Sequence, residues 1–206
     1  MPDVNPVNPS SQLNLNCATT NEVSGQCIAQ SALNIIAHSG RSYAFSEAPS
    51  SPYKNLSGNK VPNQTQIAWL KNKNKCNQFV GDALSAAGVG VPTNRMADGT
   101  EHYKIAESFP NESAYFSKLD STADVQVGDV FVKDYGADDG ECGGHTEVVV
   151  EVDRRRNVIK LAGAHRNGAY VSEMSLNNES WKFNPLQKSW TNGLDNIYFL
   201  RARKKA

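Results

Sequence analysis

Cys76, His145 and His165 are the residues whose types and settings could perform nucleophilic chemistry in this sequence. Cys76 opens the segment KCNQFVGDALSAAG, residues 75–88, in which apolar residues recur at helical spacing. The free amides and the dipole at the start of a helix favour a thiolate, the nucleophilic form of cysteine, and the lysine-rich run LKNKNK before it acts in the same direction. Such a thiolate could attack a carbonyl carbon, with the Cys76 amide facing the developing oxyanion. The alternative is a buried cysteine that only packs.

His145 has the setting of a general base. It follows the glycine pair Gly143 and Gly144 in GECGGHTEVVV and begins a run rich in β-branched residues. The glycines leave room for a substrate backbone, and a strand would fix the position of the imidazole ring. We therefore expect His145 to act as base and Gly144 and Asn77 to contact substrate. The alternative is a histidine that merely ends a strand.

A base needs a partner that orients its second ring nitrogen. The predicted strands 145–153 and 158–165 are joined by the polar segment DRRRN, and a hairpin centred there places His145 opposite His165. Directly paired residues share a face, with Cβ atoms ~5 Å apart. The register therefore selects His165 as the third catalytic residue. Glu147 lies on the same face as His145 and is the next candidate, and is also expected to contact substrate.

The elements that must position these residues change in type along the chain. Helical spacing predicts helices over 25–38 and 75–88, and a further helix around HYKIAESF, residues 102–109. A long loop at 40–64 separates the first two. Period-two patterns then predict strands over 125–134, 145–153, 158–165, 169–174 and 196–204. Helices followed by an antiparallel sheet indicate an α+β fold.

The 206 residues suit one domain, which we assign to 25–206, preceded by an extended or poorly ordered arm at 1–24. The 21 basic and 21 acidic residues cancel, which argues against a nucleic-acid-binding protein. No apolar run approaches the ~20 residues that span a bilayer, so membrane insertion is not expected. The first residues lack the basic start and apolar core of a signal peptide. We expect a monomer without a cofactor.

The cysteines allow two further interpretations. Cys17 and Cys27 are close enough in sequence for a small disulfide loop, although two free thiols are an equally simple arrangement. A Cys2His2 zinc site is an alternative to the thiol nucleophile, and its ligands would be Cys76, Cys142, His145 and His165.

Four motifs resemble those of the CHAP and NlpC-type amidases, which are papain-like cysteine enzymes. KCNQFVGDALSAAGVGVP is similar to their cysteine helix, VGDVFVKD followed by GGHTEVVVEV to their Gly-Asp and Gly-His strands, and IYFLRAR to their last strand. The similarity covers roughly residues 65–203. It implies a papain-like α+β fold in which the nucleophile helix packs on an antiparallel sheet. It also implies Cys76 as nucleophile, His145 as base and His165 as orienting residue.

The same resemblance implies hydrolysis of amide bonds in the stem peptides of bacterial peptidoglycan, by an endopeptidase or amidase. Alternatives are acyl transfer or deamidation at the same Cys–His site, or a non-catalytic binding module. The Lys-Cys-Asn-x-Phe-Val form also resembles amidase toxins of type VI secretion. That likeness implies an antibacterial effector delivered to the periplasm or cell wall, with an immunity or inhibitor protein as partner. The acidic segment 134–141 and the loop 40–64 are expected to line the groove and read a cationic or amidated diamino acid.

Overall fold

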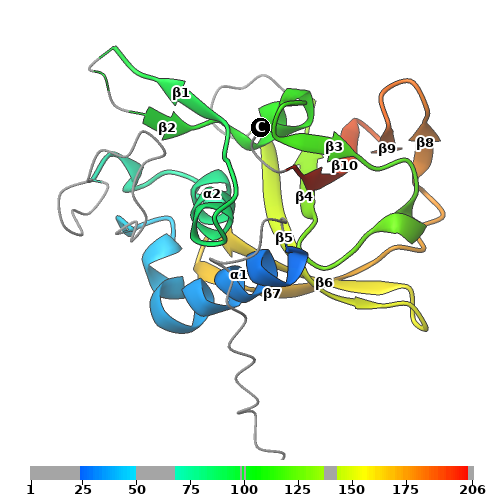
Figure 1. The fold of residues 1–206 in the computed structure, drawn as a ribbon, viewed down its shortest axis with the longest axis horizontal. Coiled ribbons are helices and arrows are strands. Elements are labelled where there is room, and N and C mark those ends of the chain that lie inside the picture. Colours follow the sequence, from blue (N-terminus) through cyan, green and yellow to red (C-terminus); the bar gives the residue numbers. More distant parts are fainter. Residues whose placement is uncertain (1–23, 50–67, 98, 100, 137–142, 204–206) are drawn as a thin grey trace, which may run out of the picture.

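The computed structural model describes residues 24–49, 68–97, 99, 101–136 and 143–203, and these form an α+β fold with few helices and one large antiparallel sheet (Figure 1). The predicted arm at 1–24 lies almost wholly outside the described residues. The described α- and 3-10 helices (η) are, in chain order, α1 (Gly25–Ser39), η1 (Gly40–Tyr43), η2 (Ala68–Leu70), α2 (Cys76–Ala86), η3 (Ala106–Asn111) and η4 (Thr122–Asp124). None of the described helices is long and apolar enough to span a membrane.

The described strands divide between a short hairpin and the main sheet. In chain order they are β1 (Thr93–Arg95), β2 (Glu101–Tyr103), β3 (Phe116–Lys118), β4 (Val130–Asp134), β5 (Gly144–Asp153), β6 (Val158–His165), β7 (Gly168–Ser175), β8 (Lys182–Asn184), β9 (Ser189–Asn192) and β10 (Asp195–Ala202). β1 and β2 pair only with each other. The main sheet has the order β7-β6-β5-β4-β10-β9-β8, and β3 pairs with β10.

The two α-helices pack together against β5 and β6, as the ribbon shows (Figure 1). Apolar residues buried between helices and sheet make one core cluster, which includes Phe79 and Leu84 of α2 and Val148 of β5. A second cluster, which includes Val149 of β5 and Phe199 of β10, covers the opposite face of the sheet. Successive residues of a strand point to opposite faces, so one strand supplies both cores. Helix α2 is thereby fixed over the middle of the sheet.

The helix predicted around HYKIAESF is largely wrong. Glu101–Tyr103 form β2, and only the 3-10 helix η3 follows, with Pro110 inside it. A Cβ on Gly81 of α2 would lie 2.3 Å from the ring of Tyr103, so this ring packs directly on the helix backbone. Such tertiary contact outweighs local helical spacing.

The strand predicted at 125–134 begins only at Val130. Before it the backbone turns, with a φ of +90° at Gly128. Asp129 stabilises this turn, because its Oδ2 accepts a hydrogen bond of 2.7 Å from the Gln126 amide. Its carboxylate also forms an ion pair of 3.0 Å with Arg201. Asp129 therefore marks the entry of the strand, as its position in VGDV indicates.

Candidate functional site

Cys76 is the first residue of α2, and its side chain is buried, with 6% of the residue exposed. The helix begins here because Phe79, Val80 and the apolar residues after them are drawn into the core. It ends before Gly88, whose φ of +75° suits a glycine at a helix C-terminus. The Cys76 Sγ lies 4.0 Å from the carbonyl oxygen of Gly144, at the start of β5. Helix α2 and strand β5 therefore meet at their first residues.

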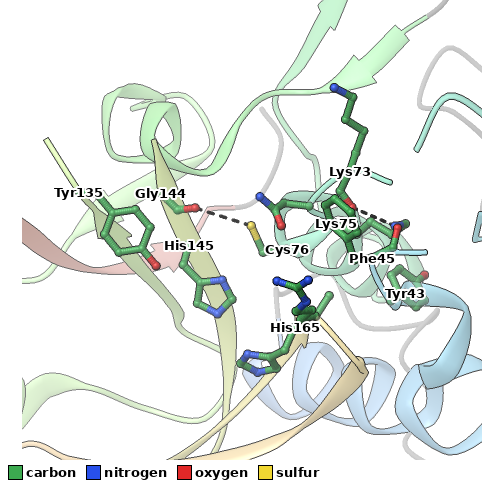
Figure 2. A pocket seen from close by; sticks show the side chains of 12 residues that line it. Tyr43, Phe45, Lys73, Lys75, Cys76, Tyr135, Gly144, His145 and His165 are labelled. Carbon is green, nitrogen blue, oxygen red and sulfur yellow. Dashed lines mark hydrogen bonds between the residues drawn. The ribbon is translucent and has the colours of Figure 1, made fainter. Parts of the chain in front are cut away.

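A cavity of about 210 Å³ opens at this meeting point (Figure 2). Its walls come from the end of η1, the segment before α2 and the facing ends of β5 and β6. The lining residues are Tyr43, Phe45, Lys73, Asn74, Lys75, Cys76, Tyr135, Gly144, His145, Ala164, His165 and Arg166. Sequence reasoning did not single out Arg166, which follows His165 at the end of β6. It expected the segments 40–64 and 134–141 to line the groove, and Phe45 and Tyr135 of these segments do line the cavity.

His145 lies between Cys76 and Glu147. Its Nε2 is 3.7 Å from Glu147 Oε2, so Nδ1 is the ring nitrogen left to exchange a proton with Cys76. Burial lowers the pKa of His145, but hydrogen bonds to Cys76 and Glu147, together with their negative charges, outweigh burial and raise this pKa to about 10. The imidazole of His145 therefore favours the protonated form.

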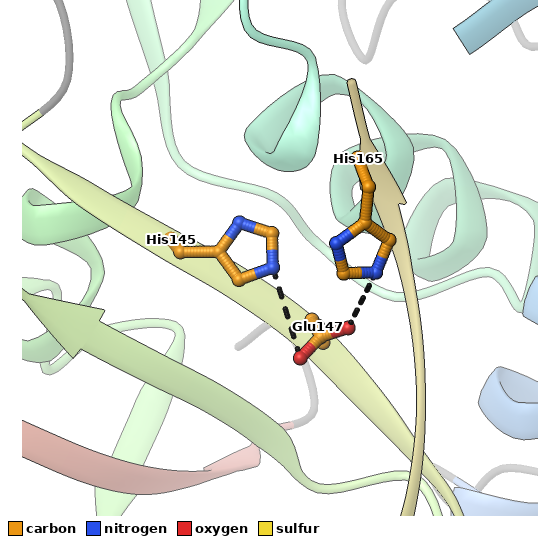
Figure 3. Close-up of side chains that lie close together, drawn as sticks. All are labelled: His145, Glu147 and His165. Carbon is orange, nitrogen blue, oxygen red and sulfur yellow. Dashed lines mark ion pairs between the residues drawn. The ribbon is translucent and has the colours of Figure 1, made fainter. Parts of the chain in front are cut away.

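Glu147 holds two histidines at once (Figure 3). Only 4% of the residue is exposed, and its Oε1 lies 3.1 Å from His165 Nε2. That contact is an ion-pair distance without the geometry of a hydrogen bond. Burial raises the pKa of Glu147, but its close polar contacts with His145 and His165 and the charge of these histidines outweigh burial and lower this pKa to about 2. Ser172 of β7 adds a long hydrogen bond of 3.4 Å to Oε1.

The predicted hairpin register is confirmed at this end of the sheet. Val148 pairs with Ala162 and Val149 with Leu161, and beyond Val149 a bulge shifts the pairing by one residue. Pairing does not extend as far as His145 and His165. Continued by one position, the register sets Gly163 opposite Glu147, where a Cβ on the glycine would lie 2.5 Å from Glu147 Cγ. The absent side chain at Gly163 provides the space for the carboxylate.

His165 reaches His145 through Glu147. The centroids of the two imidazole rings are 5.1 Å apart, and the carboxylate contacts the Nε2 atom of each. On its other side the ring of His165 stacks on Tyr170, with centroids 4.0 Å apart. The predicted third residue therefore lies in the cluster, and Glu147 is the residue that contacts Nε2 of His145. The sequence signals for Glu147 are its place two residues after His145 and the glycine in LAGAH.

The three residues predicted to contact substrate do not all lie at the cavity. Gly144 lines the cavity, whereas Asn77 and Glu147 do not. The Asn77 amide instead donates a hydrogen bond of 3.1 Å to the Lys104 carbonyl, which joins α2 to the end of β2. Glu147 lies behind the two histidines. In the acidic segment and the long loop, residues 137–141 and 50–64 lie outside the described residues.

The predicted zinc set is not brought together among the described residues. Cys142 lies outside them, and the group close enough to share a metal ion is His145, Glu147 and His165, whose ligand atoms lie within 4.8 Å of one another. Contacts of the Glu147 carboxylate with the two imidazoles also account for this cluster without a metal. Cys76 is a free thiol and Cys27 is in a disulfide. Pairing of Cys27 with Cys17 stays a prediction, because Cys17 lies outside the described residues.

Comparison with models of known protein families gives no match, and comparison with curated proteins finds no similar sequence.

Proposed function

We propose that this protein is a cysteine hydrolase with a papain-like fold that cleaves amide bonds in the stem peptides of bacterial peptidoglycan. The observation that carries the proposal is the ordered contact of Cys76 with His145 and of His145 with Glu147, at the wall of a cavity. A thiol at a helix start, a base on a strand and a buried carboxylate behind it are the parts of a nucleophilic triad. The motif resemblance supplies the substrate class.

The cycle begins with the proton of Cys76 held on His145 Nδ1. The thiolate attacks the carbonyl carbon of the scissile amide, a C–S bond forms, and the carbonyl electron pair moves to the oxygen. The Cys76 amide at the start of α2 is placed to stabilise that oxyanion. As the C–N bond breaks, His145 gives its proton to the leaving nitrogen.

Deacylation uses the same groups. His145 takes a proton from water, the hydroxide attacks the thioester carbon, and the C–S bond breaks to release the carboxylic acid and the thiolate. Glu147 keeps its charge throughout, because its low pKa leaves it ionised at neutral pH. It orients the ring of His145 and stabilises the imidazolium in both halves of the cycle. His165 supports Glu147 from the other side and does not meet the reacting atoms.

The charges on the cavity wall bear on substrate choice. Lys73 and Arg166 line the cavity, and no carboxylate does so within the described part of the chain. Such a wall favours neutral or anionic groups over cationic ones. Delivery to the periplasm or cell wall, and an immunity or inhibitor protein as partner, stay proposals that rest on the motif resemblance.

Digestion of purified sacculi with mass spectrometry of the products tests the proposal. The wild-type protein is expected to release peptides cut at one amide, and Cys76→Ala is expected to lower the rate at least about 10³-fold. Intact sacculi after prolonged incubation with folded wild-type protein would contradict hydrolysis. Products that incorporate an added amine, or that have lost ammonia alone, would instead indicate acyl transfer or deamidation. Stoichiometric zinc in the purified protein would favour the metal alternative.

A further inference from the structure

Lys75 is buried directly beside the nucleophile. Only 2% of the residue is exposed, and its Nζ donates hydrogen bonds to three backbone carbonyls, at 2.8 Å to Ala44, 3.0 Å to Phe45 and 2.9 Å to Lys73. Among the described residues no carboxylate forms an ion pair with it, and Glu47 acts on it only through longer-range charge. Burial lowers the pKa of Lys75 to about 8. A buried ammonium has lost its contacts with water, so it depends on these three acceptors for its stability.

The acceptors belong to chain segments that line the cavity. Phe45 and Lys73 are wall residues from separate parts of the sequence, and the Lys75 ammonium joins them. Two backbone bonds extend this connection: the Asn72 amide donates to the Phe45 carbonyl at 2.8 Å, and the Phe45 amide donates to the Arg166 carbonyl at 2.9 Å. The wall residues Lys73, Phe45 and Arg166 are therefore connected through the Lys75 ammonium and the Phe45 backbone.

We propose that Lys75 is a positioning residue that holds the wall formed by Phe45, Lys73 and Arg166 against the start of α2, and so fixes where substrate lies relative to Cys76. The proposal rests on the proposed hydrolase function. It also replaces the expectation that this lysine acts as a free positive charge beside the thiolate. Its three donors are all used by backbone carbonyls. Lys71 and Lys73, in the same run, have exposed side chains.

Lys75→Met tests this role, because it keeps the length of the side chain and removes every donor. Lys71→Met, an exposed change four residues earlier, is the matched control. We expect Lys75→Met to raise KM about tenfold and to change kcat less than threefold, the pattern of lost substrate placement. Alkylation of Cys76 by iodoacetamide should stay within about twofold of wild type. An unchanged KM, or a loss confined to kcat and alkylation, would overturn the proposal.

Amide hydrogen exchange gives a readout that does not depend on turnover. In Lys75→Met the amides of Phe45 and Asn72 should exchange at least about tenfold faster than in Lys71→Met, while amides in the middle of β5 stay protected. Equal exchange in the two variants would refute the role of Lys75 even in an active enzyme. An inactive wild-type protein with the expected exchange difference would instead refute the hydrolase function alone.

A third measurement does not need Lys75→Met to fold. In the Cys76→Ala protein, which cannot turn over substrate, the ammonium protons of Lys75 should give a slowly exchanging NMR signal, because they are buried and bonded. Addition of an intact stem peptide should change the chemical shift of this signal, because the peptide would contact the wall residues to which Lys75 is bonded. Ammonium protons that exchange at the rate of free lysine would contradict the proposal, and so would a chemical shift that stays unchanged at saturating peptide.

Discussion

The two ends of the β5–β6 hairpin carry the same kinds of charged residues in opposite surroundings. At the end near Cys76, Glu147 contacts two histidines, and its side chain is 5% exposed. Near the turn, Glu151 pairs with Lys160 at 2.7 Å, and its side chain is 52% exposed. The exposed pair is the closer one, because the contacts of Glu147 with His165 and His145 measure 3.1 Å and 3.7 Å. At the buried end the pKa of the Glu147 carboxyl is lowered to about 2, and the pKa of the His145 imidazole is raised to about 10.

The difference shows that exclusion of water, more than contact distance, strengthens the interactions within a group of charges. Water screens the pair at the turn, where an ion pair is worth less than about 1 kcal/mol. In the buried cluster each charge depends on the others, so protonation of one is coupled to all. A set of substitutions along this one hairpin can test that contrast, beginning with its buried carboxylate.

Glu147→Gln should have the largest effect. The change removes the charge that His145 and His165 share, so it should lower the turnover rate about 10²-fold and the free energy of unfolding by about 3 kcal/mol. NMR titration should find a lower pKa for His145, because the charge of Glu147 helps to raise it. Activity assays and urea denaturation measure the other two effects. If His165→Gln costs more activity than Glu147→Gln, His165 is the third catalytic residue.

Gly163→Ala should perturb the same cluster without changing any charge. The new Cβ would lie 2.5 Å from Glu147 Cγ and 2.7 Å from its Oε1, so the buried carboxylate would have to move. Overpacking of this kind costs about 1–3 kcal/mol. Thermal denaturation and turnover assays should both show a loss. A wild-type melting temperature with normal activity would mean that Glu147 has more space than the glycine indicates.

The pH dependence of stability should report on the charges at the buried end of the hairpin. The pKa of His145 is raised in the folded protein, so its stabilising contribution is complete below about pH 6.5 and is lost as the pH rises through about 10. Cys76→Ala removes one cause of the raised pKa. Urea denaturation between pH 6 and 10 should therefore show a smaller decrease for Cys76→Ala than for wild type. Parallel pH profiles would contradict the coupling of Cys76 with His145.

Glu151→Gln should have the smallest effect and serves as the exposed control for Glu147→Gln. Loss of its pair with Lys160 should change the free energy of unfolding by less than about 0.5 kcal/mol and leave turnover unchanged. Urea denaturation at low and high salt measures the effect. A cost near that of Glu147→Gln would remove the distinction between the two ends.

Sequence reasoning predicted the parts of this site that depend on local pattern. The helix at Cys76 and the strands around His145 and His165 follow from apolar spacing, and the register follows from the short hairpin. It could not predict that Glu147, and not His165, contacts Nε2 of His145, because that contact depends on burial and on space left by a glycine in the neighbouring strand. The buried state of Lys75 depends on segments that contact it only after folding.

The bulge after Val149 has a practical consequence. The strand pairing shifts by one residue at this bulge, which lies between the histidines and the turn at 154–157. A small change in the turn can therefore be taken up at the bulge before it reaches the histidines. A dye or affinity tag attached at the exposed Arg155 should therefore leave the strand faces near Cys76 unaltered. That turn offers a place from which to observe or immobilise the protein while its cavity stays accessible.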